Sequence, residues 1–157
     1  MTRRSPPRRI SLRQVPRPAP LEGRRLRHLL ARALDAMGIP RCDLRIRVVG
    51  DREMARWHRD YLGVEGTTTV LSFPEGATSG GAPERLSGDL LVSAPACLAQ
   101  TRGWKASPEE RVLFFLVHGM LHLAGHDHTR GAAQAARMRR EEDRVWRAAV
   151  TPAEGEP

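Results

Sequence analysis

Four of the chain's six histidines lie in the eleven residues HGMLHLAGHDH, from His118 to His128. His118 and His122 are four positions apart, so on a helix their imidazoles project from one face and can both reach one ion. Gly125 suits the left-handed conformation that ends a helix, and such a turn would return His128 to the same point. Three imidazoles with metal bonds of about 2.0–2.1 Å suit zinc and leave a fourth position open, as catalytic zinc sites do. We therefore predict a metal centre made by these three histidines.

Two other polar residues of this segment are open to more than one interpretation. His126 could replace His128 as a ligand only if the helix continued past Gly125; otherwise we expect it to support a ligand or to face the cleft. Asp127 could orient a ligand imidazole or transfer protons, and the alternative is an ordinary polar loop residue. Histidines that each satisfy their own hydrogen bonds are the alternative to the whole metal centre, and the spacing disfavours it.

The residue after the first histidine decides which hydrolases fit. The spacing H-x-x-x-H-x-x-G-x-x-H is shared with metzincin proteases, in which a glutamate at that position is the general base. Here the position holds Gly119, which cannot accept a proton. Phosphodiester cleavage depends less on a carboxylate, because a metal can generate hydroxide and polarise a phosphoryl oxygen. We therefore expect a nuclease, with a metzincin-like metalloprotease as the alternative.

Several segments of the chain together resemble one family. HGMLHLAGHDH closely resembles the HGxLHLxGYDH motif of the YbeY family of rRNA maturation factors and endoribonucleases, with His126 where tyrosine is usual. Other motifs of that family are matched by TTTVLSFP (67–74), GDLLVS (88–93) and RMRREED (137–143). The likeness runs roughly from residue 44 to residue 149, so it extends well beyond one motif.

This resemblance implies a zinc-dependent endoribonuclease whose ligands are His118, His122 and His128. Its substrate would be single-stranded RNA, in maturation of small-subunit rRNA and in ribosome quality control, with the ribosomal small subunit and its proteins as partners. Two positions depart from the family pattern, because Leu62 stands where many members carry an arginine and Thr69 stands where aspartate is usual. A zinc-stabilised assembly factor that binds rRNA without cutting it therefore stays an alternative.

The RNA is expected to lie along the VLSF segment, with the Ser72 hydroxyl and arginine side chains near the phosphate oxygens. Arg59, or Arg56 in the same predicted helix, could supply the cation, and either could instead be an ordinary solvated helix arginine. Aromatic residues make up 4% of the chain and no RRM, KH or zinc-ribbon signature is present. We therefore expect no wide stacking platform, and specificity that comes from partners.

The remaining patterns predict the elements that position these residues, in a single α/β (α+β) domain over residues 21–150. Helical patterns cover 21–40, 51–63, 95–103, 107–125 and 132–149, and strand patterns cover 44–50, 67–73 and 88–94. The segment 75–86 is turn-forming. Asp51 is expected to be an N-cap, and Ser107 before Pro108 is a stronger helix start. The helix from Ser107 to Gly125 is apolar on all sides, so we predict a central buried helix packed on a small mixed sheet.

The net charge of +8 is concentrated at the start of the chain, where the first thirty residues carry nine arginines and one glutamate. We predict that residues 1–20 form a flexible Arg/Pro-rich arm rather than part of a folded basic face. Such an arm suits loose attraction to phosphates, and a disordered extension or an over-called start is the alternative. Residues 151–157 are expected to be a tail.

Cys42 and Cys97 form no C-x-x-C motif, so we expect reduced thiols in the core. No run approaches the ~18 apolar residues of a membrane span, and prolines interrupt every candidate signal-peptide core. We therefore expect a cytoplasmic protein without a membrane partner.

Overall fold

The computed structural model describes residues 8–14, 21–76, 84–126 and 131–152. Its elements, in chain order, are β1 (Arg8–Gln14), α1 (Gly23–Met37), β2 (Arg41–Val49), α2 (Asp51–Leu62), β3 (Val70–Pro74), β4 (Arg85–Ser93), α3 (Ala94–Gln100), α4 (Pro108–Leu123) and α5 (Ala132–Val150). The mixed α/β class that the sequence predicts is confirmed.

The strands form one sheet in the order β1-β2-β4-β3. β1, β2 and β4 run parallel, whereas β3 pairs antiparallel with β4 and is an edge strand. Leu71 lies opposite Leu91 and Ser72 lies opposite Leu90 in this last pair. Because side chains alternate along a strand, Leu71 and Ser72 face opposite sides of the sheet.

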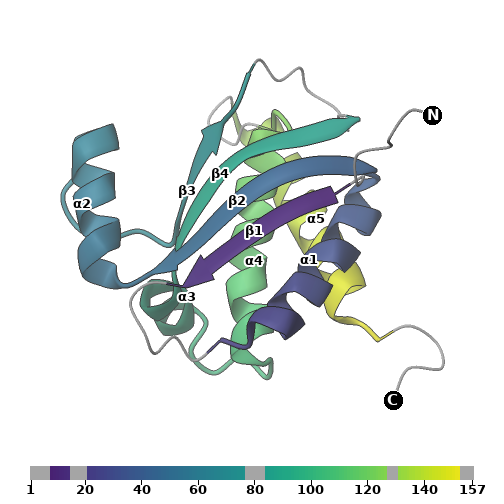
Figure 1. Cartoon of the computed structure of the whole chain (residues 1–157), viewed down its shortest axis with the longest axis horizontal. Helices are drawn as coiled ribbons and strands as arrows, with labels where there is room; N and C mark the ends of the chain where they lie inside the picture. Colours follow the sequence, from purple (N-terminus) through teal and green to yellow (C-terminus); the bar gives the residue numbers. More distant parts are fainter. Residues whose placement is uncertain (1–7, 15–20, 77–83, 127–130, 153–157) are drawn as a thin grey trace, which may run out of the picture.

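One face of the sheet is covered by α1, α4 and α5 (Figure 1). The main core lies between these layers, and α4 is nearly surrounded, with apolar residues such as Leu116 and Met120 fully buried. Ser107 forms a complete capping box with Glu110 at the start of α4. The central buried helix is therefore confirmed, although it ends at Leu123, two residues earlier than predicted.

The opposite face of the sheet, called here the open face, carries α2 at one end (Figure 1). Met54 of α2 is fully buried against Val49, Leu71 and Leu91, which form a second, smaller core. Gly63 ends α2 with a φ of 66°, as the sequence predicts.

The predicted role of Asp51 as an N-cap is wrong, because Gly50 occupies that position and Asp51 is the first residue of α2. Its carboxylate instead accepts hydrogen bonds from the hydroxyls of Ser93, at 2.7 Å, and Thr67, at 3.3 Å. Asp51 therefore ties α2 to the end of β4 and to the segment that precedes β3.

The predicted flexible arm is wrong for residues 8–14, which form β1 and pair with β2 along their whole length. Ile10 and Leu12 pack on the main core, and Arg8 donates to the carbonyl of Ile39 and pairs with Asp35. The alternation of two apolar residues between polar ones is a strand signal that the high arginine content obscured. Residues 1–7 and 15–20 of the predicted arm lie outside the described residues.

Most of the segment predicted as turn-forming, 77–83, also lies outside the described residues, and its last two residues, Arg85 and Leu86, belong to β4. Cys42 and Cys97 are buried and unbridged, and burial raises the pKa of the Cys97 thiol to about 12. Neither thiol is available as a nucleophile at neutral pH. No helix in the described part of the chain is long and apolar enough to span a membrane.

Candidate metal centre and nuclease groove

Two of the predicted ligands meet on the last turns of α4. The Nε2 atoms of His118 and His122 lie 3.0 Å apart, and the ring centroids are separated by 4.6 Å. Two nitrogen atoms bound about 2.0–2.1 Å from one tetrahedral ion would lie about 3.3 Å apart, which is close to the separation of the two Nε2 atoms. The i, i+4 spacing therefore brings the two imidazoles to one point, as helix geometry requires.

A carboxylate from α5 holds the first imidazole. Glu142, which is only 8% exposed, makes a hydrogen bond through Oε1 with Nδ1 of His118. When Nδ1 donates its proton to this carboxylate, Nε2 is left with a lone pair that faces Nε2 of His122. Such carboxylate–histidine pairs fix the orientation of metal-binding imidazoles and make them more basic. The donor set present therefore fits a divalent cation between the two rings.

Glu142 is a residue that the sequence interpretation missed. Met138, Val145 and Ala149 define the buried stripe of α5, and Glu142 lies on that stripe four positions after Met138. A carboxylate in an apolar stripe is almost never buried without a partner, so this position could have signalled a buried hydrogen bond.

The third predicted ligand, His128, and its neighbour Asp127 lie outside the described residues. Gly125 has a φ of 97°, so the left-handed turn predicted after α4 is confirmed. The backbone N–H of His126 donates to the carbonyl of Leu121 and closes this turn. In the described ranges, no group of three ligating side chains comes together.

Beside the imidazoles lies a groove of about 580 Å³ along edge strand β3. Its described lining consists of residues 68–74, His58 and Leu62 of α2, and the two α4 histidines. Ser72 and Thr69 both belong to this lining, and the Ser72 hydroxyl donates to the carbonyl of Gly119 at 3.2 Å. An edge strand also presents unpaired backbone N–H groups, which are donors for an anionic substrate.

Gly119 lies where α4 approaches the sheet closely. A Cβ at this position would lie 2.8 Å from Leu90 Cδ2 and 3.0 Å from Ser72 Oγ. A glutamate there would therefore have to displace the side chains of Leu90 and Ser72, so this packing disfavours the general base of a metzincin protease.

His58 is a second residue that the sequence interpretation missed. Its Nδ1 lies 2.9 Å from the carbonyl of Gly66, so Nδ1 carries the proton of a neutral ring and Nε2 is its acceptor. Leu62 lies four residues later on the same helix and also lines the groove. The i, i+4 relation to Leu62, a position already singled out in the sequence, is the signal that could have located His58.

The two arginines expected near the RNA lie on exposed parts of α2. Arg59 pairs with the neighbouring Asp60 at 3.3 Å, and neither Arg59 nor Arg56 is among the described residues that line the groove. The described lining includes no arginine or lysine side chain at all.

Comparison with known proteins places the chain in a family. The model of the family described as Endoribonuclease YbeY matches residues 20–149. The chain belongs to the YbeY family. The protein named Endoribonuclease YbeY in Chloroflexus aurantiacus is 39% identical over 109 residues, which cover 66% of this chain and 71% of the relative. The protein of the same name in Geobacter sulfurreducens is 36% identical over 130 residues, or 81% of this chain and 86% of the relative. The predicted family is therefore confirmed.

A solved structure supports the same fold. The solution structure of a Thermotoga maritima protein superposes with a TM-score of 0.56 and covers 95% of this chain and 100% of its own. Its sequence identity is 18%, so the likeness concerns the fold alone.

Proposed function

We propose that this chain is a zinc-dependent endoribonuclease that cleaves single-stranded RNA during maturation of small-subunit rRNA and in ribosome quality control. The observation that carries the proposal is the convergence of His118 and His122, with His118 held by Glu142, at the end of a groove along an edge strand. The endoribonuclease relatives support the reaction type.

The proposed ligands of the zinc are His118, His122 and His128. When bound, zinc supplies a Lewis acid that polarises a phosphoryl oxygen and makes a nearby water acidic enough to ionise near neutral pH. Glu142 keeps the His118 ring in the orientation that directs Nε2 to the ion, since its carboxylate accepts the Nδ1 proton. The proposed role of Asp127 in handling protons belongs to the same part of the site.

In this proposal the groove residues have two roles, which are to bind the RNA phosphates and to accept a proton during cleavage. The free edge of β3 offers backbone N–H groups to the phosphates, and the hydroxyl of Ser72 lies in the same lining. His58 is the proposed proton acceptor, because its Nδ1 is engaged by the Gly66 carbonyl and Nε2 is its unprotonated nitrogen. Arg59 and Arg56 are exposed on α2 and remain candidates for phosphate contacts outside the groove.

The proposed setting is the cytoplasm, with the small ribosomal subunit and its proteins as partners that supply specificity. The buried, unbridged state of Cys42 and Cys97 suits a reducing compartment.

A cleavage assay tests the proposal. Labelled single-stranded RNA is incubated with zinc-loaded protein, with protein treated with chelator, and with His122→Ala. We expect cleavage by the zinc-loaded protein, loss of cleavage with chelator and its recovery on adding zinc, and no cleavage by His122→Ala. His28→Ala, at an exposed histidine of α1, is the matched control and should cleave at the wild-type rate. Cleavage that survives both chelator and His122→Ala would indicate a contaminating nuclease and contradict the proposal.

A non-catalytic rRNA-binding factor is the second candidate, and one observation favours it. The described lining of the groove has no arginine or lysine to neutralise phosphate charge, and Leu62 is 60% exposed at its rim. Zinc-loaded protein that binds single-stranded RNA but leaves it intact would favour this candidate.

A further inference from the structure

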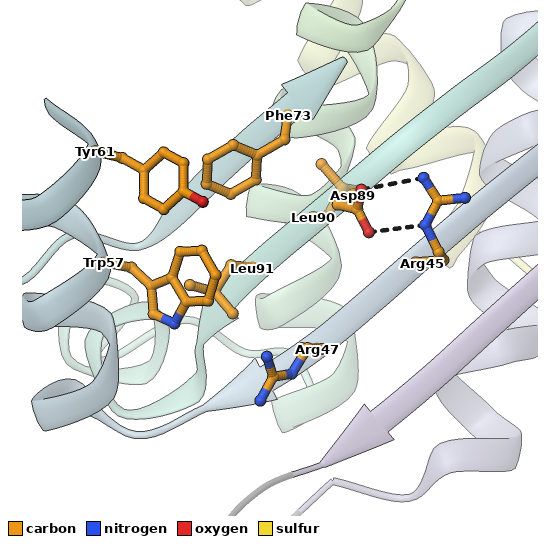
Figure 2. Close-up of a pocket in the computed structure, with 8 residues that line it drawn as sticks. All are labelled: Arg45, Arg47, Trp57, Tyr61, Phe73, Asp89, Leu90 and Leu91. Atoms are coloured by element: carbon orange, nitrogen blue, oxygen red, sulfur yellow. Dashed lines mark hydrogen bonds and ion pairs between the residues drawn. The ribbon is translucent and has the colours of Figure 1, made fainter. Parts of the chain in front are cut away.

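A second hollow lies on the open face of the sheet, between α2 and β2, and is called here the aromatic trough (Figure 2). Its volume is about 450 Å³. It is lined by Arg45 and Arg47 of β2, Trp57 and Tyr61 of α2, Phe73 of β3, and Asp89, Leu90 and Leu91 of β4. None of these side chains has a role in the metal centre or in the proposed reaction. Phe73 alone also lines the groove.

Three of the chain's seven aromatic residues form one side of the trough. The rings of Trp57 and Tyr61 are nearly parallel, with centroids 5.0 Å apart, and Phe73 meets Tyr61 edge-on at 5.1 Å. Tyr61 is 61% exposed. In the described part of the chain, neither the indole N–H of Trp57 nor the hydroxyl of Tyr61 has a hydrogen-bond partner. Exposed stacked rings with free donors are the features that bind nucleobases.

The opposite side of the trough is cationic, and its two arginines are held differently. Arg45 makes two hydrogen bonds to Asp89, at 2.8 and 3.0 Å, and one to Glu75 at 3.1 Å, and these bonds raise its pKa. Its charge is therefore already balanced. Among the described residues, Arg47 has one ion-pair partner, Glu53 at 3.2 Å, so its remaining donors are available to a phosphate.

β1 adds further positive charge next to the trough. The strand register sets Arg13 directly beside Arg47 on the open face, and Arg9 lies four positions earlier on the same face. Both side chains are exposed, and neither has an acidic partner among the described residues. The charge that the sequence assigned to an unfolded arm therefore lies, in part, on a folded surface.

The trough and the groove lie on opposite sides of strand β3. Ser72 faces α4 and bonds to the carbonyl of Gly119, whereas the neighbouring residue Phe73 contributes its ring to the aromatic trough. Because Phe73 lines both hollows, one extended polymer that crosses β3 can occupy the groove and the trough together. A single strand of RNA has the bases and phosphates that suit the two sides of the trough.

We propose that the aromatic trough is a second binding subsite for single-stranded RNA, in which a base stacks on Tyr61 and Trp57 while phosphates contact Arg47 and Arg13. This inference rests on the proposed function, because it assigns the same RNA to a position beyond the cleaved bond. It concerns binding alone, so it can be tested without cleavage.

The test measures binding of a labelled single-stranded RNA in the presence of chelator, so that cleavage plays no part. The double variant Trp57→Leu/Tyr61→Ser should bind about 10-fold or more weakly, because it removes both rings on which a base would stack. Arg13→Glu/Arg47→Glu should bind more weakly. The slope of the logarithm of affinity against the logarithm of salt concentration should become shallower by about one for each arginine. The matched controls are Trp104→Leu, in the other aromatic cluster, and Arg24→Glu on α1, and both should bind as wild type does.

A second measurement uses the unaltered protein, because Trp57 contributes to the small core and its replacement could affect folding. RNA carrying 5-iodouridine should form a photochemical cross-link to the peptide that contains Trp57 and Tyr61. Absence of that cross-link, together with unchanged affinity in both trough variants, would overturn the proposal and favour a protein partner at the trough. If zinc-loaded protein cleaves no RNA but the trough variants still lose affinity, the proposed function fails and the subsite stands.

Discussion

The two sides of strand β3 present different chemistry to the solvent. The groove side holds imidazoles, from His118, His122 and His58, and polar groups of the strand itself. The trough side holds stacked aromatic rings and guanidinium groups. Imidazoles bind metal ions and move protons near neutral pH, whereas aromatic rings and arginines bind nucleic acid without reacting. The comparison suggests that one edge strand separates the groups for reaction from those for recognition.

The two sides also differ in how their side chains are held. In the groove, Glu142 fixes His118 and the Ser72 hydroxyl binds the backbone of α4, so these two groups have buried partners. In the trough, Tyr61 is held by ring contacts and stays largely exposed. Substitutions in the groove should therefore impair metal binding or turnover, whereas substitutions in the trough should impair RNA affinity.

Apart from loss of a metal ligand, the largest effect is expected for His58→Ala. Loss of a positioned proton acceptor should lower kcat by about 10²–10⁴-fold, with little change in RNA affinity. Single-turnover cleavage at saturating RNA measures this. His28→Ala is the control at an exposed position. A wild-type kcat in His58→Ala would show that His58 is not the proton acceptor.

Glu142→Gln should lower zinc affinity by about 10–100-fold, because the amide no longer accepts the His118 Nδ1 proton as a carboxylate does. Competition with a chromophoric chelator measures the affinity. The neighbouring Glu141→Gln is a matched control, since Glu141 pairs instead with Arg144 at 2.8 Å. Equal zinc affinity in the two variants would show that Glu142 does not support a metal ligand.

Gly119→Ala should lower the free energy of unfolding by about 1–3 kcal/mol, because the added methyl group would lie too close to Leu90 and Ser72. Chemical denaturation measures the change. Gly23→Ala, at the start of α1, has only contacts of 3.9 Å and should be neutral or slightly stabilising. Only the change at Gly119 should be destabilising, and equal effects of the two changes would contradict the close approach of α4 to β3.

The smallest effect is expected for Ser72→Ala. It removes the hydrogen bond to the Gly119 carbonyl, so the free energy of unfolding should fall by about 1 kcal/mol, while kcat falls by less than about 10-fold. A much larger loss of kcat at unchanged stability would give Ser72 a direct role on the RNA, as the sequence analysis expected.

Local patterns in the sequence predicted a large part of the groove. The four-residue spacing of His118 and His122, the capping box that begins at Ser107 and the turn at Gly125 all depend on neighbours within a few residues. Helix geometry fixes such relations whatever surrounds the helix, so composition and spacing were enough. The family followed from the same motifs.

Relations between distant segments required the tertiary structure. Glu142 is 24 residues from His118 in sequence, and only the packing of α5 on α4 brings the two together. Arg13 lies beside Arg47 only because β1 joins the sheet, which a composition rich in arginine and proline concealed. Tyr61 and Phe73 likewise come from different elements, so a low aromatic content gave no sign of their contact. The sequence determined the chemistry available along single helices and strands, whereas the packing of those elements decided which side chains could act together, because long-range contacts depend on the whole core.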